Sequence, residues 1–111
     1  FADYAAACKT TMRYPRDLHP LVPVYPTLAL CGEAGELAEK VKKILRDRPK
    51  DQPLTPEETE GMLKEVGDCL WYLNAIAVDF GSTLEAVATL NVEKLQARSL
   101  RGTLHGSGDN R

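Results

Sequence analysis

The prolines of this 111-residue chain fall in two clusters, and this distribution limits where helices can form. Four of the seven lie between Pro15 and Pro26, and the other three lie between Pro49 and Pro56. Because proline breaks a helix interior, the clusters mark two connections and leave the other stretches free to be helical. No segment has the strict apolar–polar alternation of a half-buried strand. The sequence therefore predicts an all-α chain, with helices near residues 2–13, 27–47, 56–80 and 83–100.

Capping signals support two of these boundaries. Thr55 suits an N-cap, Pro56 suits the first helical position, and Glu58 completes a capping box. Ser82 repeats this spacing with the glutamate three residues later, directly after Gly81, a residue type that commonly ends a helix. We therefore expect one helix to start near residue 56 and another near residue 83.

Apolar residues recur at steps of three and four along each long helix, the pattern that bundle packing requires. The stripes are Leu30, Ala34, Leu37, Val41 and Ile44; Met62, Val66, Cys69, Leu73, Ile76 and Phe80; and Leu84, Val87, Ala88, Asn91 and Leu95. A bundle this small buries little apolar area, so we expect about four helices completed by a homo-oligomer, a dimer or tetramer. Residues 1–111 are expected to form one domain, with core helices in 24–98 and a glycine-rich tail at 101–111.

Composition excludes several classes of protein. Lys and Arg number 14 against 16 Asp and Glu, a net charge of −2 that offers no basic surface to nucleic acid. No apolar run approaches the ~20 residues that span a bilayer, and no signal-peptide pattern opens the chain. Cys8, Cys31 and Cys69 lie in apolar stretches without a CxxC pair, which is typical of reduced, buried thiols. We expect a soluble, cytoplasmic protein with no nucleic-acid or membrane partner.

The most informative motif appears twice, as Glu33-Ala-Gly-Glu36 and Glu65-Val-Gly-Asp68. The spacing i, i+3 places both acids of a pair on one helix face, and each pair flanks an apolar stripe. If the two helices pack antiparallel along their stripes, four carboxylates converge at the edge of the core. Such charges raise one another's pKa unless a cation lies among them. Oxygen ligands favour Mg²⁺ first and Mn²⁺ second, so the motif predicts a metal site at these four acids.

Glycines accompany both acid pairs. Gly32, Gly35 and Gly67 each cost a helix ~1 kcal/mol relative to alanine. The missing side chains would let a neighbouring helix, a metal or a phosphate approach the backbone closely. This advantage offsets the unfavourable helix propensity.

The acid pairs also fit other kinds of surface or site. Most Glu-x-x-Glu pairs are solvated faces with a lysine at i+4, and Glu36 has Lys40 there, whereas the other three acids have no such cation. A di-iron bundle needs Glu-x-x-His on two helices, and neither His19 nor His105 follows a glutamate by three. Zinc is disfavoured because the sequence has no Cys/His cluster at ligand spacing.

Three segments in order resemble the MazG-like all-α nucleoside triphosphate pyrophosphohydrolases, a superfamily that includes dimeric dUTPases, dCTP pyrophosphatases and phosphoribosyl-ATP pyrophosphohydrolase. Residues 28–40 (LALCGEAGELAEK) look like its first metal helix, and residues 64–73 (KEVGDCLWYL) like its second. Residues 91–98 (NVEKLQAR) are similar to its phosphate-contacting C-terminal helix. The resemblance covers residues 24–98. Many relatives continue with Arg-Tyr-Pro, where this chain has Ser99-Leu100-Arg101.

The resemblance implies hydrolysis of a nucleoside triphosphate to the monophosphate and pyrophosphate, with Mg²⁺ held by Glu33, Glu36, Glu65 and Asp68. Glu36 is our choice for the carboxylate that orients or deprotonates the attacking water. The implied substrate contacts are Tyr72, Asn91, Lys94 and Arg98, with Trp71 stacking on the base. Asn91 would otherwise bond a neighbouring helix and Trp71 would otherwise be core.

The sequence leaves alternatives for the roles of the two chain ends and for the function. The proline-rich segment, with Tyr14, Arg16, His19 and Tyr25, suits either a lid or base pocket, or an arm at a dimer interface. In the tail, Arg101 and Arg111 are candidates to close over phosphates. One alternative function is a non-catalytic metal- and nucleotide-binding regulatory helical module. The other is a structural bundle whose acids are surface residues.

Overall fold

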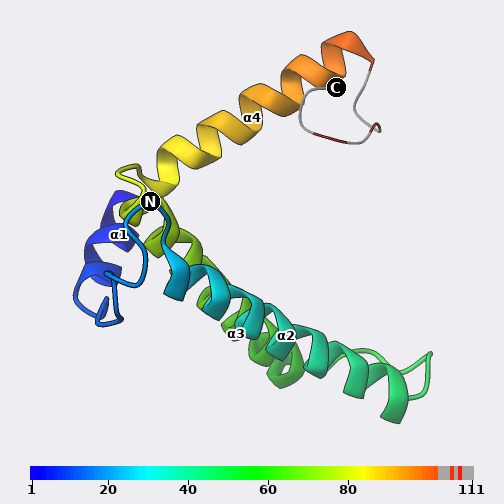
Figure 1. The fold of residues 1–111 in the computed structure, drawn as a ribbon. Coiled ribbons are helices and arrows are strands. Elements are labelled where there is room, and N and C mark those ends of the chain that lie inside the picture. Colours follow the sequence, from blue (N-terminus) through cyan, green and yellow to red (C-terminus); the bar gives the residue numbers. More distant parts are fainter. Residues whose placement is uncertain (103–105, 107, 109–111) are drawn as a thin grey trace.

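The computed structural model describes residues 1–102, 106 and 108, and within them the chain forms four helices and no strand (Figure 1). The helices are α1 (Ala2–Lys9), α2 (Val24–Asp47), α3 (Pro56–Asp79) and α4 (Leu84–Arg101). The prediction of an all-α fold with about four helices is confirmed. Most of the glycine-rich tail, including His105 and Arg111, lies outside the described residues.

Two helix boundaries differ from the prediction. α1 ends at Lys9 rather than near residue 13, and the hydroxyls of Thr10 and Thr11 donate to the carbonyls of Ala7 and Cys8 at 2.7 and 3.1 Å. Such side-chain bonds offer the backbone an alternative to the next helical turn. α2 begins at Val24, three residues early, with Pro26 in its first turn. There a proline is tolerated because the first backbone N–H groups have no partner within the helix.

The turn between α3 and α4 explains why one capping signal was misassigned. Gly81 has a φ of +76°, its N–H donates to the carbonyl of Val78, and the N–H of Ser82 donates to that of Ala77. These two bonds close α3 in a Schellman motif. Since Ser82 belongs to the end of α3, the N-cap of α4 is Thr83, whose hydroxyl accepts from the N–H of Ala86. The capping box at the start of α3 is confirmed.

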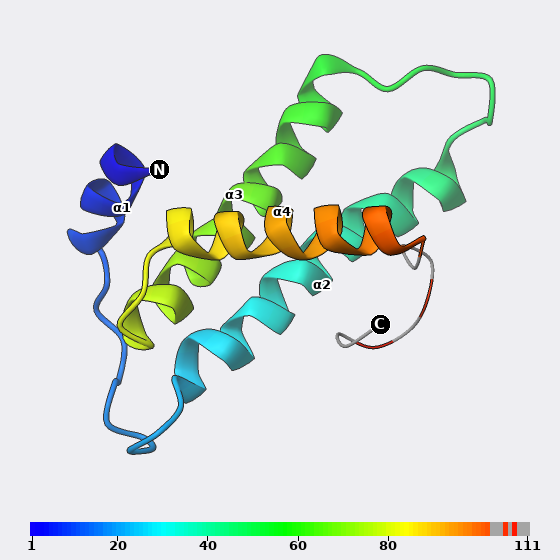
Figure 2. The same ribbon diagram turned by 90° about the horizontal axis from the view of Figure 1, so that it is seen from above.

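α2 and α3 form an antiparallel hairpin, and α1 packs against α3 (Figure 1). α4 leaves α3 at 96° and extends away from the hairpin; only in projection does it cross α2 and α3 in Figure 2. α4 is therefore not the fourth member of a closed bundle. No single helix within the described residues is long and apolar enough to cross a membrane. Taken together, the bent pair of α3 and α4 has the length and the apolar composition of a span.

Close packing is concentrated where α1, the start of α2, the C-terminal half of α3 and the start of α4 meet. The apolar residues buried there are Cys8, Pro26, Ala75, Ala77 and Leu84. Elsewhere the apolar stripes are partly open: on α3, Val66 is 47% exposed and Leu73 is 43% exposed.

The three cysteines are free thiols, but Cys31 is exposed, so its predicted burial is wrong.

Candidate functional site

Three of the four predicted carboxylates meet across the α2–α3 hairpin. Glu33 on α2 and both Glu65 and Asp68 on α3 each bring one oxygen within 4.8 Å of the others. The i, i+3 spacing turns both α3 acids toward α2, as the sequence predicted. Glu36, one turn after Glu33, lies outside this group of three. We refer to Glu33, Glu65 and Asp68 below as the acidic cluster.

The charge of the acidic cluster is only partly balanced. Burial, followed by the charges of Asp68, Glu65 and Glu36, raises the pKa of Glu33. One cation is present, since Lys40 Nζ lies 2.9 Å from Glu65 Oε1 and also donates to the carbonyl of Gly61 at 3.3 Å. Lys40 therefore pairs across the hairpin, and not with Glu36 on its own helix as the i+4 spacing suggested.

A pocket of about 320 Å³ connects the acidic cluster to two aromatic side chains. It is lined by Thr11, Glu33, Asp68, Trp71 and Tyr72. The rings of Trp71 and Tyr72 meet edge to face, with centroids 5.0 Å apart. Burial raises the pKa of Tyr72, and the charges of Tyr25, Glu33 and Asp68 add to the shift. Trp71 lines this pocket and is half-buried, so it is both a wall of the pocket and a packing residue.

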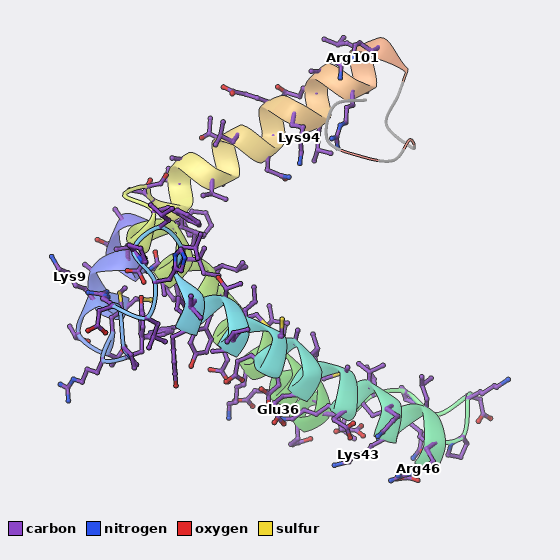
Figure 3. The ribbon with its side chains drawn as sticks, in the orientation of Figure 1. Lys9, Glu36, Lys43, Arg46, Lys94 and Arg101 are labelled. Atoms are coloured by element: carbon purple, nitrogen blue, oxygen red, sulfur yellow. The ribbon has the colours of Figure 1, made fainter. Side chains whose placement is uncertain are left out.

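The predicted contacts on α4 lie apart from the acidic cluster within one chain. Figure 3 labels Lys94 and Arg101 along α4 and Glu36 on the hairpin, and the two helical arms diverge. Asn91 is exposed and Lys94 is half-buried. Arg98 is buried, and its Nη2 donates to the carbonyl of Gly108 at 3.1 Å. One chain thus brings Tyr72 and Trp71 to the acids, but not Asn91, Lys94 or Arg98.

The glycines beside the acids face open space. A Cβ built at Gly32, Gly35 or Gly67 would meet no atom of the described residues within 4 Å, apart from immediate neighbours and the local helix backbone. A close approach of another helix of this chain, one of the reasons considered for these glycines, is therefore not observed. The open space leaves room beside the acids for a ligand or for a second chain.

Two residues, Thr11 and Asp79, were not predicted from the sequence. Thr11 lines the pocket, and no local pattern marks this threonine because its partner Trp71 is 60 positions away. Asp79 accepts a hydrogen bond from Tyr14 and pairs with Arg16. Asp79 follows Tyr72 by seven residues and thus continues the α3 face that carries the acids, a signal that was present in the sequence.

The donor set fits a hard divalent cation. Each of the three clustered side chains offers a carboxylate oxygen, the ligand type that Mg²⁺ and Mn²⁺ prefer. No Lys or Arg pairs with Glu33 or Asp68 among the described residues, and a cation bound between them would relieve their mutual repulsion. Within the part of the chain that the structure covers, no histidine or thiolate joins the group, which disfavours zinc.

Comparisons with known proteins found a matching family model and similar sequences. A family model described as "MazG nucleotide pyrophosphohydrolase domain" matches residues 26–101. Gene 37 protein of Mycobacterium phage L5 is 48% identical over 87 residues, which cover 78% of this chain and 75% of that protein. The uncharacterized protein YvdC of Bacillus subtilis (strain 168) is 36% identical over 72 residues, covering 62% and 68%. No solved structure is a significant match.

Proposed function

Because the chain belongs to the MazG nucleotide pyrophosphohydrolase family, we propose that it hydrolyses nucleoside triphosphates to the monophosphate and pyrophosphate. The observation that carries this proposal is the pocket in which Glu33 and Asp68 adjoin Trp71 and Tyr72. Carboxylates beside aromatic rings suit a ligand that combines metal-bound phosphates with a flat base. The role that fits this activity is removal of non-standard or excess nucleotides, and the free thiols suit the reducing cytoplasm.

The proposed cation is Mg²⁺, with Mn²⁺ as a substitute, held by Glu33, Glu36, Glu65 and Asp68. When bound, it would neutralise charge on the phosphate oxygens. Glu36 is also the proposed catalytic base, because it lies one turn from Glu33 but outside the acidic cluster, so one carboxylate oxygen can face the cation and the other a water molecule. Its carboxylate can orient a water molecule and accept the proton that this water loses as it attacks phosphorus, while the α–β phosphoanhydride bond breaks to leave the monophosphate and pyrophosphate.

The proposal assigns the base and the phosphates to different parts of the protein. Trp71 and Tyr72 contact the base beside the acidic cluster. The phosphates meet Asn91 and Lys94 on α4 of another copy in a dimer or tetramer, because α4 bends away from its own hairpin. Arg98 joins them on release of its bond to the carbonyl of Gly108. Exposed apolar side chains support such self-association: Leu90 on α4 is 65% exposed and Leu63 on α3 is 61% exposed.

The test is release of pyrophosphate from each NTP and dNTP, with Mg²⁺ or with EDTA. We expect Mg²⁺-dependent release that Asp68→Asn and Glu36→Gln each lower by at least roughly 100-fold. Glu39→Gln is the matched control, since Glu39 lies on α2 but is exposed and pairs with Lys42 at 2.9 Å. This control should retain wild-type activity.

Two results would contradict hydrolysis at this site. Release that is unaffected by both variants would move the chemistry elsewhere. Mg²⁺-dependent binding of a nucleotide in calorimetry, with no product after long incubation, would favour the regulatory binding module instead.

A further inference from the structure

Asp79, near the C-terminal end of α3, ties the connection between α1 and α2 to that helix. Tyr14 Oη donates to Asp79 Oδ2 at 2.5 Å, and Arg16 Nε lies 3.4 Å from Asp79 Oδ1. The Asp79 side chain is only 15% exposed and the Arg16 side chain is 50% exposed, so the bond from Tyr14 is the better shielded of the two contacts. Burial and the bond to Asp79 raise the pKa of Tyr14, which keeps its hydroxyl protonated as the donor. One carboxylate thus fixes two points of residues 10–23.

The same connection holds the indole of Trp71 at two points. Trp71 Nε1 donates to Thr11 Oγ1 at 3.0 Å, and this hydroxyl in turn donates to the carbonyl of Cys8. The ring of Tyr14 meets the indole edge to face, with centroids 6.1 Å apart and planes at 76°. Tyr25 stacks on the Tyr14 ring with centroids 5.6 Å apart, and the Arg16 guanidinium lies over that ring at 5.1 Å, so Tyr14 is held by several neighbours. The position of Tyr14 therefore sets the orientation of Trp71.

Asp79 itself does not line the pocket of the acidic cluster, whereas Thr11 and Trp71 do. We propose that Asp79 is a positioning residue for the nucleotide: through Tyr14 and Arg16 it fixes the connection that holds Trp71 as the wall of the acidic pocket. The inference rests on the proposed function in one respect, that this wall receives the base of a nucleoside triphosphate.

The expected consequence is weaker substrate binding with the chemical step retained. A side chain fixed before binding spares the ligand the entropy of ordering it, which corresponds to roughly 3- to 10-fold in affinity for one large side chain. Loss of the Asp79 contacts should raise KM by that factor and leave kcat within about twofold, because the acidic cluster is untouched. A general loss of folding would instead lower kcat through a smaller fraction of active protein.

Trp71 is the one tryptophan of the chain, so its fluorescence reports this contact directly. The variants are Asp79→Ala and Tyr14→Phe; the second keeps the ring and removes only the hydroxyl. In both we expect lower emission anisotropy and faster quenching by acrylamide than in the wild type, without any nucleotide. Asp47→Ala is the control because Asp47 pairs with Arg46 at the exposed end of α2.

A second measurement connects the fluorescence to binding. Affinity for an α,β-imido nucleoside triphosphate, measured by calorimetry with Mg²⁺, should fall roughly 3- to 10-fold in Tyr14→Phe and stay unchanged in Asp47→Ala. Unchanged Trp71 fluorescence in Tyr14→Phe and Asp79→Ala overturns the positioning role, whatever the activity is. Altered fluorescence with unchanged affinity and KM overturns the link to the nucleotide. If the wild type hydrolyses nothing, the proposed function fails, and the fluorescence result still decides whether Asp79 positions Trp71.

Discussion

The α2–α3 hairpin and α4 both carry predicted site residues, but they present them in different ways. In the hairpin, the acids lie along the edge of the apolar stripe on α2 and on α3. These two edges face one another, so acids from the two helices come within 4.8 Å. α4 carries Asn91, Lys94 and Arg98 on an arm at 96° to α3, and its apolar side chains are widely exposed. Register within a hairpin is therefore enough to build an acidic site, whereas the cationic part depends on what α4 packs against.

The strongest test of this comparison puts a substitution in the hairpin of one chain and a substitution in α4 of another. Asp68→Asn and Lys94→Ala are each expected to be inactive alone. If the cations come from another copy, a mixed dimer of the two variants contains one site that has both native parts. Random association then restores about a quarter of the wild-type activity. The measurement is pyrophosphate release after the two variants are mixed, partly unfolded and refolded together.

The control for mixing is Asp68→Asn with Glu65→Gln, both on the hairpin. No mixed dimer of these two has an intact acidic cluster, so activity should stay at the background. Recovery confined to the first mixture supports a site shared between chains. Failure of the first mixture to recover would return Lys94 to its own chain or remove it from the site.

A smaller effect concerns the charge of the acidic cluster, and Glu33→Gln measures it. The folded-state pKa of Glu33 is raised above its ordinary value of 4.5, so its stabilising contribution is complete below that value and is lost as pH rises through the folded value. In EDTA at neutral pH the variant should therefore melt at a higher temperature than the wild type. This difference should vanish near about pH 4.

Bound Mg²⁺ should reverse the order of the two melting temperatures, so that the wild type melts above Glu33→Gln. Mg²⁺ at about 100 times its Kd should add about 2.7 kcal/mol to the wild type and much less to Glu33→Gln. Glu39→Gln should shift the melting temperature in the opposite direction to Glu33→Gln, because the hydrogen bond from Lys42 lowers the pKa of Glu39. Its removal should lower the melting temperature slightly at neutral pH. Thermal melts over a pH series, with and without Mg²⁺, test both expectations, and identical profiles for the two variants would contradict them.

The smallest expected effect compares the two helix starts. Thr55 at α3 both accepts from the N–H of Glu58 and donates its own N–H to that side chain, whereas Thr83 at α4 makes one such bond. Alanine keeps the backbone N–H, so Thr55→Ala and Thr83→Ala each remove one hydroxyl acceptor and should each lower the free energy of unfolding by about 1 kcal/mol. Urea unfolding measures both. A clearly larger loss in Thr55→Ala would mean that the bond from the N–H of residue 55 to Glu58 depends on the hydroxyl as well.

Most of the hairpin could be predicted from local pattern. The second proline cluster separated α2 from α3, Thr55 and Glu58 marked the start of α3, and the position of each acid beside an apolar stripe brought three of them together. These features depend on residues within about a turn of one another, and helix geometry fixes such distances.

The remainder depended on contacts between distant parts of the chain. The i+4 rule paired Lys40 with Glu36 because it considers one helix at a time, but the long lysine side chain reaches Glu65 across the hairpin. The bond from Trp71 to Thr11 likewise requires knowing how residues 10–23 cross α3. The stripe on α4 predicted an apolar face but not its partner, and the chain bends by 96° between α3 and α4, at a turn that contains the left-handed Gly81.

The turn between α3 and α4 also determines where this chain tolerates a change of length. Gly81 and Ser82 are both bonded to the end of α3, and Thr83 already caps α4, so the turn has no spare residue. One residue added within α4 before Asn91 would rotate everything after it by about 100° about the helix axis. The connection at residues 48–55 lies at the far end of the hairpin (Figure 1), where doubling a loop costs only about 0.6 kcal/mol. Insertions, whether natural or an engineered tag, are therefore compatible with the site at 48–55 and incompatible with it between Asp79 and Asn91.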